Sequence, residues 1–134
     1  MSHRSYLLDT NILLAAVMAP ERLPQDVQNW LGDPLNAVYF SAASIWEIGI
    51  KRSLNRDGFN FFPEDIHRLA LDTRFTELTV QAEHCHGIAR MPWHHRDSFD
   101  RLLVAQAQSL PAYLLTTDDL LVRYSDWVVY VALR

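Results

Sequence analysis

The stretch SYLLDTNILLAAV (residues 5–17) places three polar residues between two apolar segments. The residues YLL before it have the character of a short buried strand, and NILLAAVMA, which begins at residue 11, has that of a helix. Asp9, Thr10 and Asn11 separate the two. An ionised carboxylate there costs several kcal/mol or more unless it caps a helix, pairs with a cation or binds a metal ion. The stretch therefore predicts a strand–helix turn built around Asp9.

The chain has 134 residues, a length typical of one domain, and we expect a single domain over residues 1–134. Its single cysteine, Cys85, excludes an intrachain disulfide and a thiolate zinc site. The sequence has neither a signal-peptide pattern nor a membrane-spanning apolar run, so we expect a cytoplasmic protein without membrane contact. A net charge of −4 disfavours binding of nucleic acid through bulk positive charge. It does not exclude a nucleic-acid enzyme whose acids hold a cation.

Strand-like and helix-like segments alternate along the chain. Short apolar runs predict further strands in AVYFS (37–41), FTELTV (75–80), AYLLTT (112–117) and WVVYV (127–131). Apolar spacing and Pro or Gly boundaries predict helices over 24–32, 41–55, 63–73, 81–91, 98–110 and 118–124. This alternation predicts an α/β fold with a mostly parallel sheet, helices on both faces and right-handed crossovers.

Acidic residues follow the expected carboxyl ends of the strands. Asp9 ends the first strand and Asp118 follows AYLLTT, while Glu47 and Asp100 lie near the starts of two helices on the same side. Ligands of open parallel sheets bind outside these ends. Carboxylates that meet there raise one another's pKa values and need cations. Oxygen ligands suit Mg²⁺ or Mn²⁺, and ions held in this way activate water for in-line attack on a phosphodiester.

Each acid also has an explanation that involves no catalysis. Asp9 could N-cap the following helix. Glu47 and Lys51 have the i, i+4 spacing of an ion pair on a helix surface. The acids at 118–119 suit the positive end of a helix dipole. The shared placement of the acids, rather than any one of them, is the evidence for a site.

Four segments together resemble the motifs of the PIN-domain family, and within it the VapC-type toxins of toxin–antitoxin pairs. In the family's order they are LLDTNILL (7–14), SAASIWEIGIK (41–51), FDRLLVAQA (99–107) and LLTTD (114–118). The resemblance implies a three-layer PIN-like fold with a five-stranded parallel sheet flanked by helices. It also implies Mg²⁺- or Mn²⁺-dependent cleavage of RNA, a homodimer, and inhibition by a small cognate antitoxin protein.

The resemblance also implies roles for single residues. The metal-binding and catalytic set would be Asp9, Glu47, Asp100 and Asp118. Asn11 would brace the site from the first motif, and the hydroxyl of Thr116 or Thr117 would steady the fourth.

The third and fourth motifs each contain a second acid. Relatives often have Asp-Pro-Phe-Asp in the third motif, whereas Ser98 replaces the proline here, so Asp97 and Asp100 both remain candidates. Asp100 is favoured because it directly precedes the RLLVAQA helix run, while Asp97 has the spacing of a capping box. Asp119 adjoins Asp118 and could assist or substitute for it.

Basic and aromatic side chains near the motifs give weaker indications. Lys51, Arg96 and Arg101 could line a path for RNA phosphates or equally form a solvated face. Trp30 or Trp46 could lie in an antitoxin or dimer contact, where aromatic residues are enriched.

The histidines at 84, 86, 94 and 95 raise the possibility of a transition-metal site. His84 and His86 would point to different sides of one helix, which makes them poor joint ligands. We therefore expect all four at surface or loop positions.

Other function classes fit the residues less well. A phosphatase of the haloacid dehalogenase type has an Asp-x-Asp motif, and the second acid would fall on Asn11. A receiver domain needs a lysine after a late strand, which LLTTDD does not supply. The alternative that remains is a degenerate PIN fold that binds a partner or RNA without catalysis. Because all four acidic positions are filled, the sequence favours the nuclease.

Overall fold

The computed structural model describes residues 3–54, 59–92 and 97–134. A sheet within them is formed by β1 (Ser5–Leu8), β2 (Ala37–Ser41), β3 (Thr76–Leu78), β4 (Tyr113–Thr116) and β5 (Val128–Tyr130). The strand order is β3-β2-β1-β4-β5, and every neighbouring pair is parallel. The predicted α/β fold with a five-stranded parallel sheet is confirmed.

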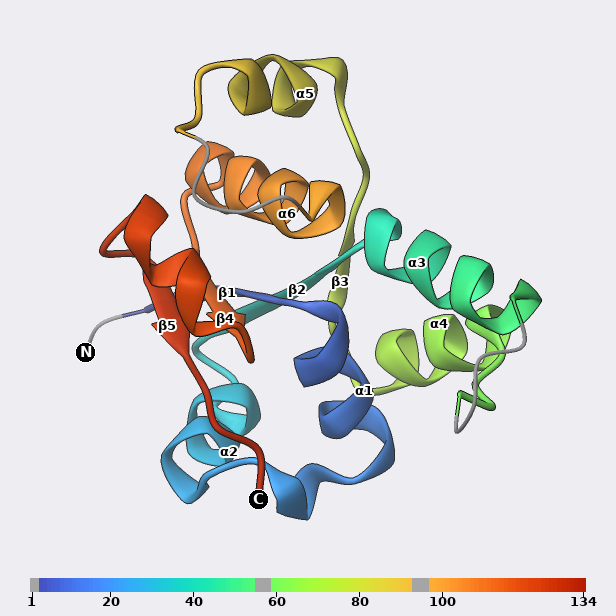
Figure 1. The fold of residues 1–134 in the computed structure, drawn as a ribbon. Coiled ribbons are helices and arrows are strands. Elements are labelled where there is room, and N and C mark those ends of the chain that lie inside the picture. The colour runs from blue at the N-terminus through green and yellow to red at the C-terminus, as the bar shows by residue number, and fades with distance from the viewer. Residues whose placement is uncertain (1–2, 55–58, 93–96) are drawn as a thin grey trace.

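Helices cover both faces of this sheet. They are α1 (Thr10–Met18), α2 (Gln25–Gly32), α3 (Ala42–Ser53), α4 (Pro63–Asp72), α5 (Ala82–Ala89) and α6 (Ser98–Ser109), with 3₁₀ helices η1 (Pro20–Arg22) and η2 (Asp119–Tyr124). Figure 1 shows α5 and α6 on one side of the sheet and α1 and α2 on the other. Among the described residues, no helix has both the length and the apolar character needed to cross a membrane.

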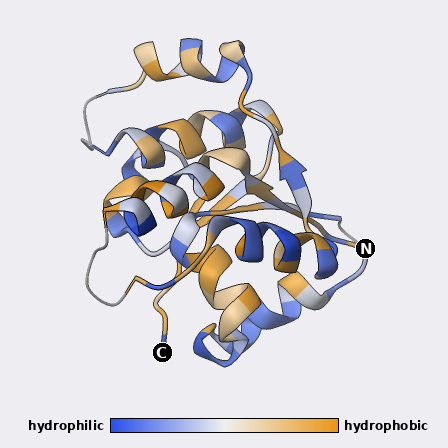
Figure 2. Cartoon of the chain, turned by 90° about the vertical axis from the view of Figure 1, so that its right-hand side faces the viewer, coloured by the Kyte–Doolittle hydropathy of each residue, from blue (hydrophilic) through white to orange (hydrophobic). Residues whose placement is uncertain are grey.

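The two faces of the sheet bury separate apolar clusters. On one face, Tyr6 and Leu8 of β1 belong to the same cluster as Leu13 of α1. On the other face, Leu7 belongs to a cluster with Leu103 of α6. Successive side chains of a strand point to opposite faces, so a strand covered on both sides is apolar at every position. This is why YLL carries no polar residue, and Figure 2 shows apolar strands between the helix layers.

The topological switch point of the sheet lies between β1 and β4, because β2 and β3 extend the sheet on one side and β4 and β5 on the other. Residues 6–8 align with residues 113–115, and the backbone N–H of Asp9 donates to the carbonyl of Leu115 at 2.9 Å. The segments that follow these two strands therefore lie side by side at the carboxyl edge of the sheet. In open parallel sheets, ligands bind at such a switch point.

One histidine differs from its predicted position. His84 is buried, and its Nδ1 accepts a hydrogen bond from the backbone N–H of Gln81 at 2.9 Å, so the prediction of a surface position was wrong. The physical reason is that the first N–H groups of a helix have no partner within the helix, and the imidazole supplies one for α5. His86 is exposed, as predicted. The predictions for residues 94 and 95 lie outside the described residues.

Candidate active site

A polar cavity of about 320 Å³ lies beyond the carboxyl ends of β1 and β4. Six acidic residues line it, and we call it the acidic cavity: Asp9, Glu47, Asp97, Asp100, Asp118 and Asp119. Thr10, Asn11, Lys51 and Thr117 complete its lining. The structure thus brings the four predicted acids together with the second acid of each later motif.

Asp9 is the most buried of these acids, with 4% of its surface exposed. Its Oδ1 accepts the N–H of Ile12 at 2.8 Å, which caps α1, and its Oδ2 accepts the N–H of Thr117 at 2.9 Å. Burial raises the pKa of the Asp9 carboxyl, and the nearby Glu47 carboxylate adds to the rise. Hydrogen bonds from Ile12, Thr117 and Thr116 lower the pKa but do not reverse the shift. Asp9 is therefore a helix cap and also a carboxylate whose negative charge calls for a cation.

Glu47 reaches the cavity from α3 and is held by neighbours on two elements. Its Oε1 accepts the hydroxyl proton of Thr10 at 2.6 Å, and its Oε2 lies 3.0 Å from Nζ of Lys51. The Thr10 hydroxyl is also 3.0 Å from the Ser44 hydroxyl, and both residues are buried. Sequence reasoning overlooked Thr10 and Ser44. Both are polar residues in segments that are otherwise apolar. Thr10 directly follows Asp9, and Ser44 lies about one helical turn before Glu47, and these positions were the available signal.

Replacing Thr10 with Val is expected to remove the hydroxyl that orients Glu47 while keeping the shape of the side chain. We expect the Thr10→Val protein to lose about 1–3 kcal/mol of unfolding free energy, because an acceptor at a partly buried carboxylate loses its donor. Urea unfolding measures this loss. Thr10→Ser retains the hydroxyl and should regain most of it; equal losses in both variants would contradict the role of the hydrogen bond.

The two acids of the third motif lie at the start of α6. Asp97 is the N-cap: its Oδ1 accepts the N–H groups of Phe99 at 2.9 Å and Asp100 at 3.3 Å. The predicted capping role of Asp97 is confirmed. Asp100 lies in the first turn and lines the cavity beside it.

The fourth motif forms the turn between β4 and η2. Asp118 caps η2 by accepting the N–H of Leu120 at 3.0 Å, and its own N–H donates to the Thr116 hydroxyl at 3.0 Å. Thr116 is fully buried beneath the cavity. Thr117 lies in the cavity wall, where its hydroxyl accepts a hydrogen bond from the Asn11 amide at 3.1 Å. The Thr117 hydroxyl thus ties the fourth motif to the turn after β1, and the Thr116 side chain also forms a hydrogen bond with the Asp9 carboxyl.

The basic residues divide between the cavity and the rest of the chain. Lys51 lines the cavity. Arg101 does not: it is buried in α6, and its Nη2 donates to the carbonyl of Ile88 in α5 at 3.2 Å. This position favours a structural role for Arg101 over a contact with substrate. Arg96 lies outside the described residues.

The donor set fits a hard divalent cation. Within the described ranges, no three His, Cys, Asp or Glu side chains converge closely enough to coordinate one ion together. Mg²⁺, however, commonly binds one or two carboxylates and retains several waters. Among the described residues, six carboxyl groups and one lysine line this cavity, which leaves space for such an ion with its waters. Burial raises the pKa of Asp9, and a cation bound beside it would stabilise the ionised carboxylate and oppose that rise.

Comparison with known proteins places this fold in a family. Residues 6–126 match the sequence pattern of the PIN domain. The chain belongs to the PIN-domain family. The match spans all four motifs and includes every acidic residue of the cavity, so the resemblance seen in the sequence is confirmed. Comparison with curated protein sequences gave no significant match.

Solved structures with a similar fold include chains of VapBC2, of a toxin–antitoxin complex and of FitAcB. A chain of VapBC2 from Rickettsia felis, bound to a DNA fragment of the promoter, has a TM-score of 0.68 at 17% identity, covering 95% of this chain and 98% of the other. A toxin–antitoxin complex from Klebsiella pneumoniae gives 0.63 at 21% identity, with 92% and 95% covered. FitAcB from Neisseria gonorrhoeae gives 0.58 at 20% identity, with 93% and 96% covered. This PIN domain therefore shares its fold with chains of these three structures.

Proposed function

We propose that this PIN-domain protein is a metal-dependent endoribonuclease and the toxin of a toxin–antitoxin pair. The observation that carries the proposal is the acidic cavity, where a buried carboxylate at the switch point of the sheet is surrounded by five further acids. Members of the PIN-domain family are typically nucleases that use divalent metals, which supports this assignment. The similar structures of toxin–antitoxin complexes support a cognate antitoxin as partner.

The proposed ligands of Mg²⁺ or Mn²⁺ are the predicted set, Asp9, Glu47, Asp100 and Asp118. The bound ion would supply an activated water and would stabilise the negative charge that develops on the scissile phosphate. Asp9 is held by two backbone N–H groups and Glu47 by the Thr10 hydroxyl, so neither carboxylate needs to reorganise before the reaction.

The remaining residues of the cavity would position these ligands and the substrate. Asn11 and Thr117 hold the turns after β1 and β4 together, while Asp97 fixes the start of α6. Asp119 lies beside the ligand set and could assist it. Lys51 is the cation in the described part of the cavity lining, which places it to contact a substrate phosphate once a metal ion takes over its partner Glu47.

Cleavage of total cellular RNA by the purified protein tests the reaction. Discrete fragments are expected in Mg²⁺ or Mn²⁺, and they should disappear when EDTA is added, because without a cation the cavity repels phosphate. Addition of the antitoxin expressed from a neighbouring gene should also suppress cleavage. Absence of cleavage in either metal, from folded protein free of inhibitor, would contradict the proposal.

A binding module without catalysis is the second candidate. The observation in its favour is that no three potential ligands converge within the described part of the chain. Isothermal titration with Mn²⁺ separates the two functions. Binding that is lost in Asp9→Asn supports the nuclease, whereas no binding by the wild-type protein favours the module.

The proposed homodimer contact involves an aromatic pair that joins α3 and α6. Trp46 of α3 is 62% exposed, and its ring lies 5.0 Å from that of Phe99 in α6, edge to face. Trp30, by contrast, is stacked on Tyr6 with ring centroids 5.6 Å apart and packs against the core. Of the two tryptophans predicted to lie in a partner contact, we therefore choose Trp46 for the dimer.

Replacing Trp46 with Ala is expected to weaken the dimer about tenfold or more, since buried tryptophans often dominate interfaces. Sedimentation equilibrium across a concentration series measures the dissociation constant. Trp127→Ala, which removes a 43% exposed tryptophan from the turn before β5, is the matched control and should leave the dimer unchanged. A wild-type monomer, or a Trp46→Ala dimer of unchanged affinity, would contradict this contact.

A further inference from the structure

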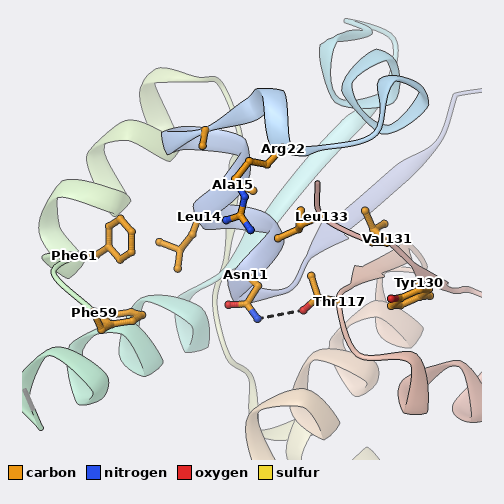
Figure 3. Close-up of a pocket in the computed structure, with 12 residues that line it drawn as sticks. Asn11, Leu14, Ala15, Arg22, Phe59, Phe61, Thr117, Tyr130, Val131 and Leu133 are labelled. Atoms are coloured by element: carbon orange, nitrogen blue, oxygen red, sulfur yellow. Dashed lines mark hydrogen bonds between the residues drawn. The ribbon is translucent and has the colours of Figure 1, made fainter. Parts of the chain in front are cut away.

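A second groove, of about 480 Å³, adjoins the acidic cavity. We call it the side groove; Asn11 and Thr117 line it, together with Phe59, Phe61, Tyr130 and Arg22. Figure 3 shows the hydrogen-bonded Asn11 and Thr117 in its middle, the two phenylalanines on one side and Tyr130 on the other. Because Asn11 and Thr117 line both cavities, the two spaces meet at this pair.

A lysine of the acidic cavity provides a second connection to the side groove. The Nζ atom of Lys51 lies 5.7 Å from the centroid of the Phe59 ring, within the range of a cation–π contact. The same ammonium is 3.0 Å from Glu47. The backbone of a nucleic acid that crosses the acidic cavity would therefore leave it beside Lys51 and the Phe59 ring.

The wall of the side groove combines aromatic surface with hydrogen-bonding groups. Phe59 and Phe61 are in edge-to-face contact at 5.3 Å, both are partly exposed, and Tyr130 is 50% exposed. Arg22 is exposed at the far end of the groove. Unpaired nucleobases are bound by stacking on aromatic rings, and guanidinium groups bind phosphate.

Hydrogen bonds hold together the two segments that form the far end of the side groove. The N–H of Arg134 donates to the carbonyl of Arg22 at 2.8 Å, and Nε of Arg22 donates to the carbonyl of Arg134 at 3.2 Å. The Arg134 guanidinium also donates to the carbonyl oxygens of Glu21 and Leu23, at 3.2 Å and 3.1 Å. The segment after β5 is thereby tied to η1, so the groove is formed before any ligand arrives. A preformed site loses less entropy on binding.

We propose that the side groove binds an unpaired nucleotide of the RNA substrate, adjacent to the phosphate held in the acidic cavity. The inference rests on the proposed ribonuclease function and adds a base-binding subsite beside the acidic cavity. A nucleotide offers both a π face for the aromatic rings and polar edges for Asn11, Thr117 and Arg22. An apolar protein segment would cover the rings but leave the remaining hydrogen-bonding capacity of these polar groups unused. A base within a duplex is stacked on its neighbours and cannot enter such a groove.

Binding of a fluorescein-labelled single-stranded RNA of mixed sequence, followed by anisotropy with Ca²⁺ in place of Mg²⁺, tests the proposal. Phe61→Ala and Tyr130→Ala are each expected to weaken binding about fivefold or more, as expected for loss of one stacked base. Phe62→Ala is the matched control: this neighbouring ring is 46% exposed, lies against Arg52 and is not part of the groove lining, so binding should be unchanged. Tyr130 is half exposed, so its variant should fold even if Phe61→Ala does not.

Photocrosslinking gives a readout independent of affinity. RNA containing 5-iodouridine should crosslink, under ultraviolet light, to peptides that contain Phe59, Phe61 or Tyr130. Crosslinks confined to other peptides, or unchanged RNA binding by both groove variants, would overturn the inference. Normal RNA binding combined with lost antitoxin binding would assign the groove to a protein and also overturn it.

The two proposals fail in distinguishable ways. If the groove variants bind and cleave RNA like the wild-type protein, the side groove is not a substrate site but the ribonuclease stands. If the wild-type protein neither binds nor cleaves RNA, the proposed function fails and the inference fails with it.

Discussion

Asp9→Asn is expected to reduce RNA cleavage about a hundredfold or more while leaving the fold intact. The substitution removes the charge of the most buried acid in the cavity, and metal-assisted stabilisation of a phosphodiester transition state is worth several kcal/mol. Asparagine has the same shape, and its amide oxygen can still accept the N–H of Ile12 that Asp9 accepts at 2.8 Å, while the N–H of Thr117 loses its acceptor. The cap of α1 is therefore retained while the metal ligand is lost. Initial rates of RNA cleavage in Mn²⁺, with circular dichroism on the same samples, measure both effects.

A matched substitution separates this result from a general effect of lost acidity. Asp72 is exposed at the end of α4 and is not part of the cavity lining, so Asp72→Asn should cleave RNA at the wild-type rate. Wild-type activity in Asp9→Asn, in a preparation free of contaminating nuclease, would exclude Asp9 from the reaction.

Mn²⁺ is expected to raise the melting temperature of the wild-type protein at neutral pH by about 5–10 °C at a concentration near 100 times its dissociation constant. The physical reason is that the ion binds the folded state, where it compensates the carboxylates that line the cavity. Removal of the ion with EDTA should reverse the rise.

The effect of Mn²⁺ should shrink as the pH falls. The pKa of Asp9 in the folded protein is raised above its ordinary value of 3.8, chiefly by burial. Protons therefore compete with the ion at Asp9 from a higher pH than they would at an exposed aspartate. The gain in melting temperature should decline as the pH approaches the raised pKa.

Without metal, the raised pKa of Asp9 favours the folded protein at low pH. This is opposite to the expected effect of pH on the stabilisation by Mn²⁺. The folded state prefers the protonated Asp9, so its contribution to stability is fully present below the pKa of the unfolded chain and is lost as the pH rises through the higher folded pKa. In EDTA, the contribution of Asp9 should thus favour the fold more at acidic pH than at neutral pH.

Thermal denaturation over a pH series, in EDTA and in Mn²⁺, measures both trends. The difference between wild type and Asp9→Asn isolates the titration of this carboxyl from that of the other acids. Asp72→Asn should retain the full response to Mn²⁺. A response to Mn²⁺ that is equal in Asp9→Asn and wild type would contradict metal binding at Asp9.

Local patterns in the sequence were enough to predict the layers of the fold. YLL and AYLLTT are apolar at nearly every position because their strands are covered on both faces, and β1 and β4 lie where these runs predict them. The capping role of Asp97 was also local, since the acceptor and its N–H donors are within three residues. Such features depend on hydrogen bonds and periodicity within one segment.

Contacts between segments could not be predicted in this way. The buried position of His84 depends on how α5 packs against the rest of the protein. The sequence favoured an exposed side chain for His84, whereas in the structure its imidazole is buried and accepts the N–H of Gln81. The burial of Arg101 depends on the carbonyl of Ile88 in another helix. Thr10 and Ser44 act on Glu47 across α1 and α3, a pairing set by the packing of two helices.

By itself, the sequence determined the alternation of strands and helices and the placement of an acid after each of two strands, because both follow from residue order. Only the tertiary structure decided that these acids share one cavity, since their meeting depends on β4 pairing with β1 across more than a hundred residues of chain. The side groove was likewise decided by tertiary structure. Its aromatic and basic residues come from segments that no short-range pattern connects, and the hydrogen bonds between residue 134 and Arg22 hold the segment after β5 beside η1.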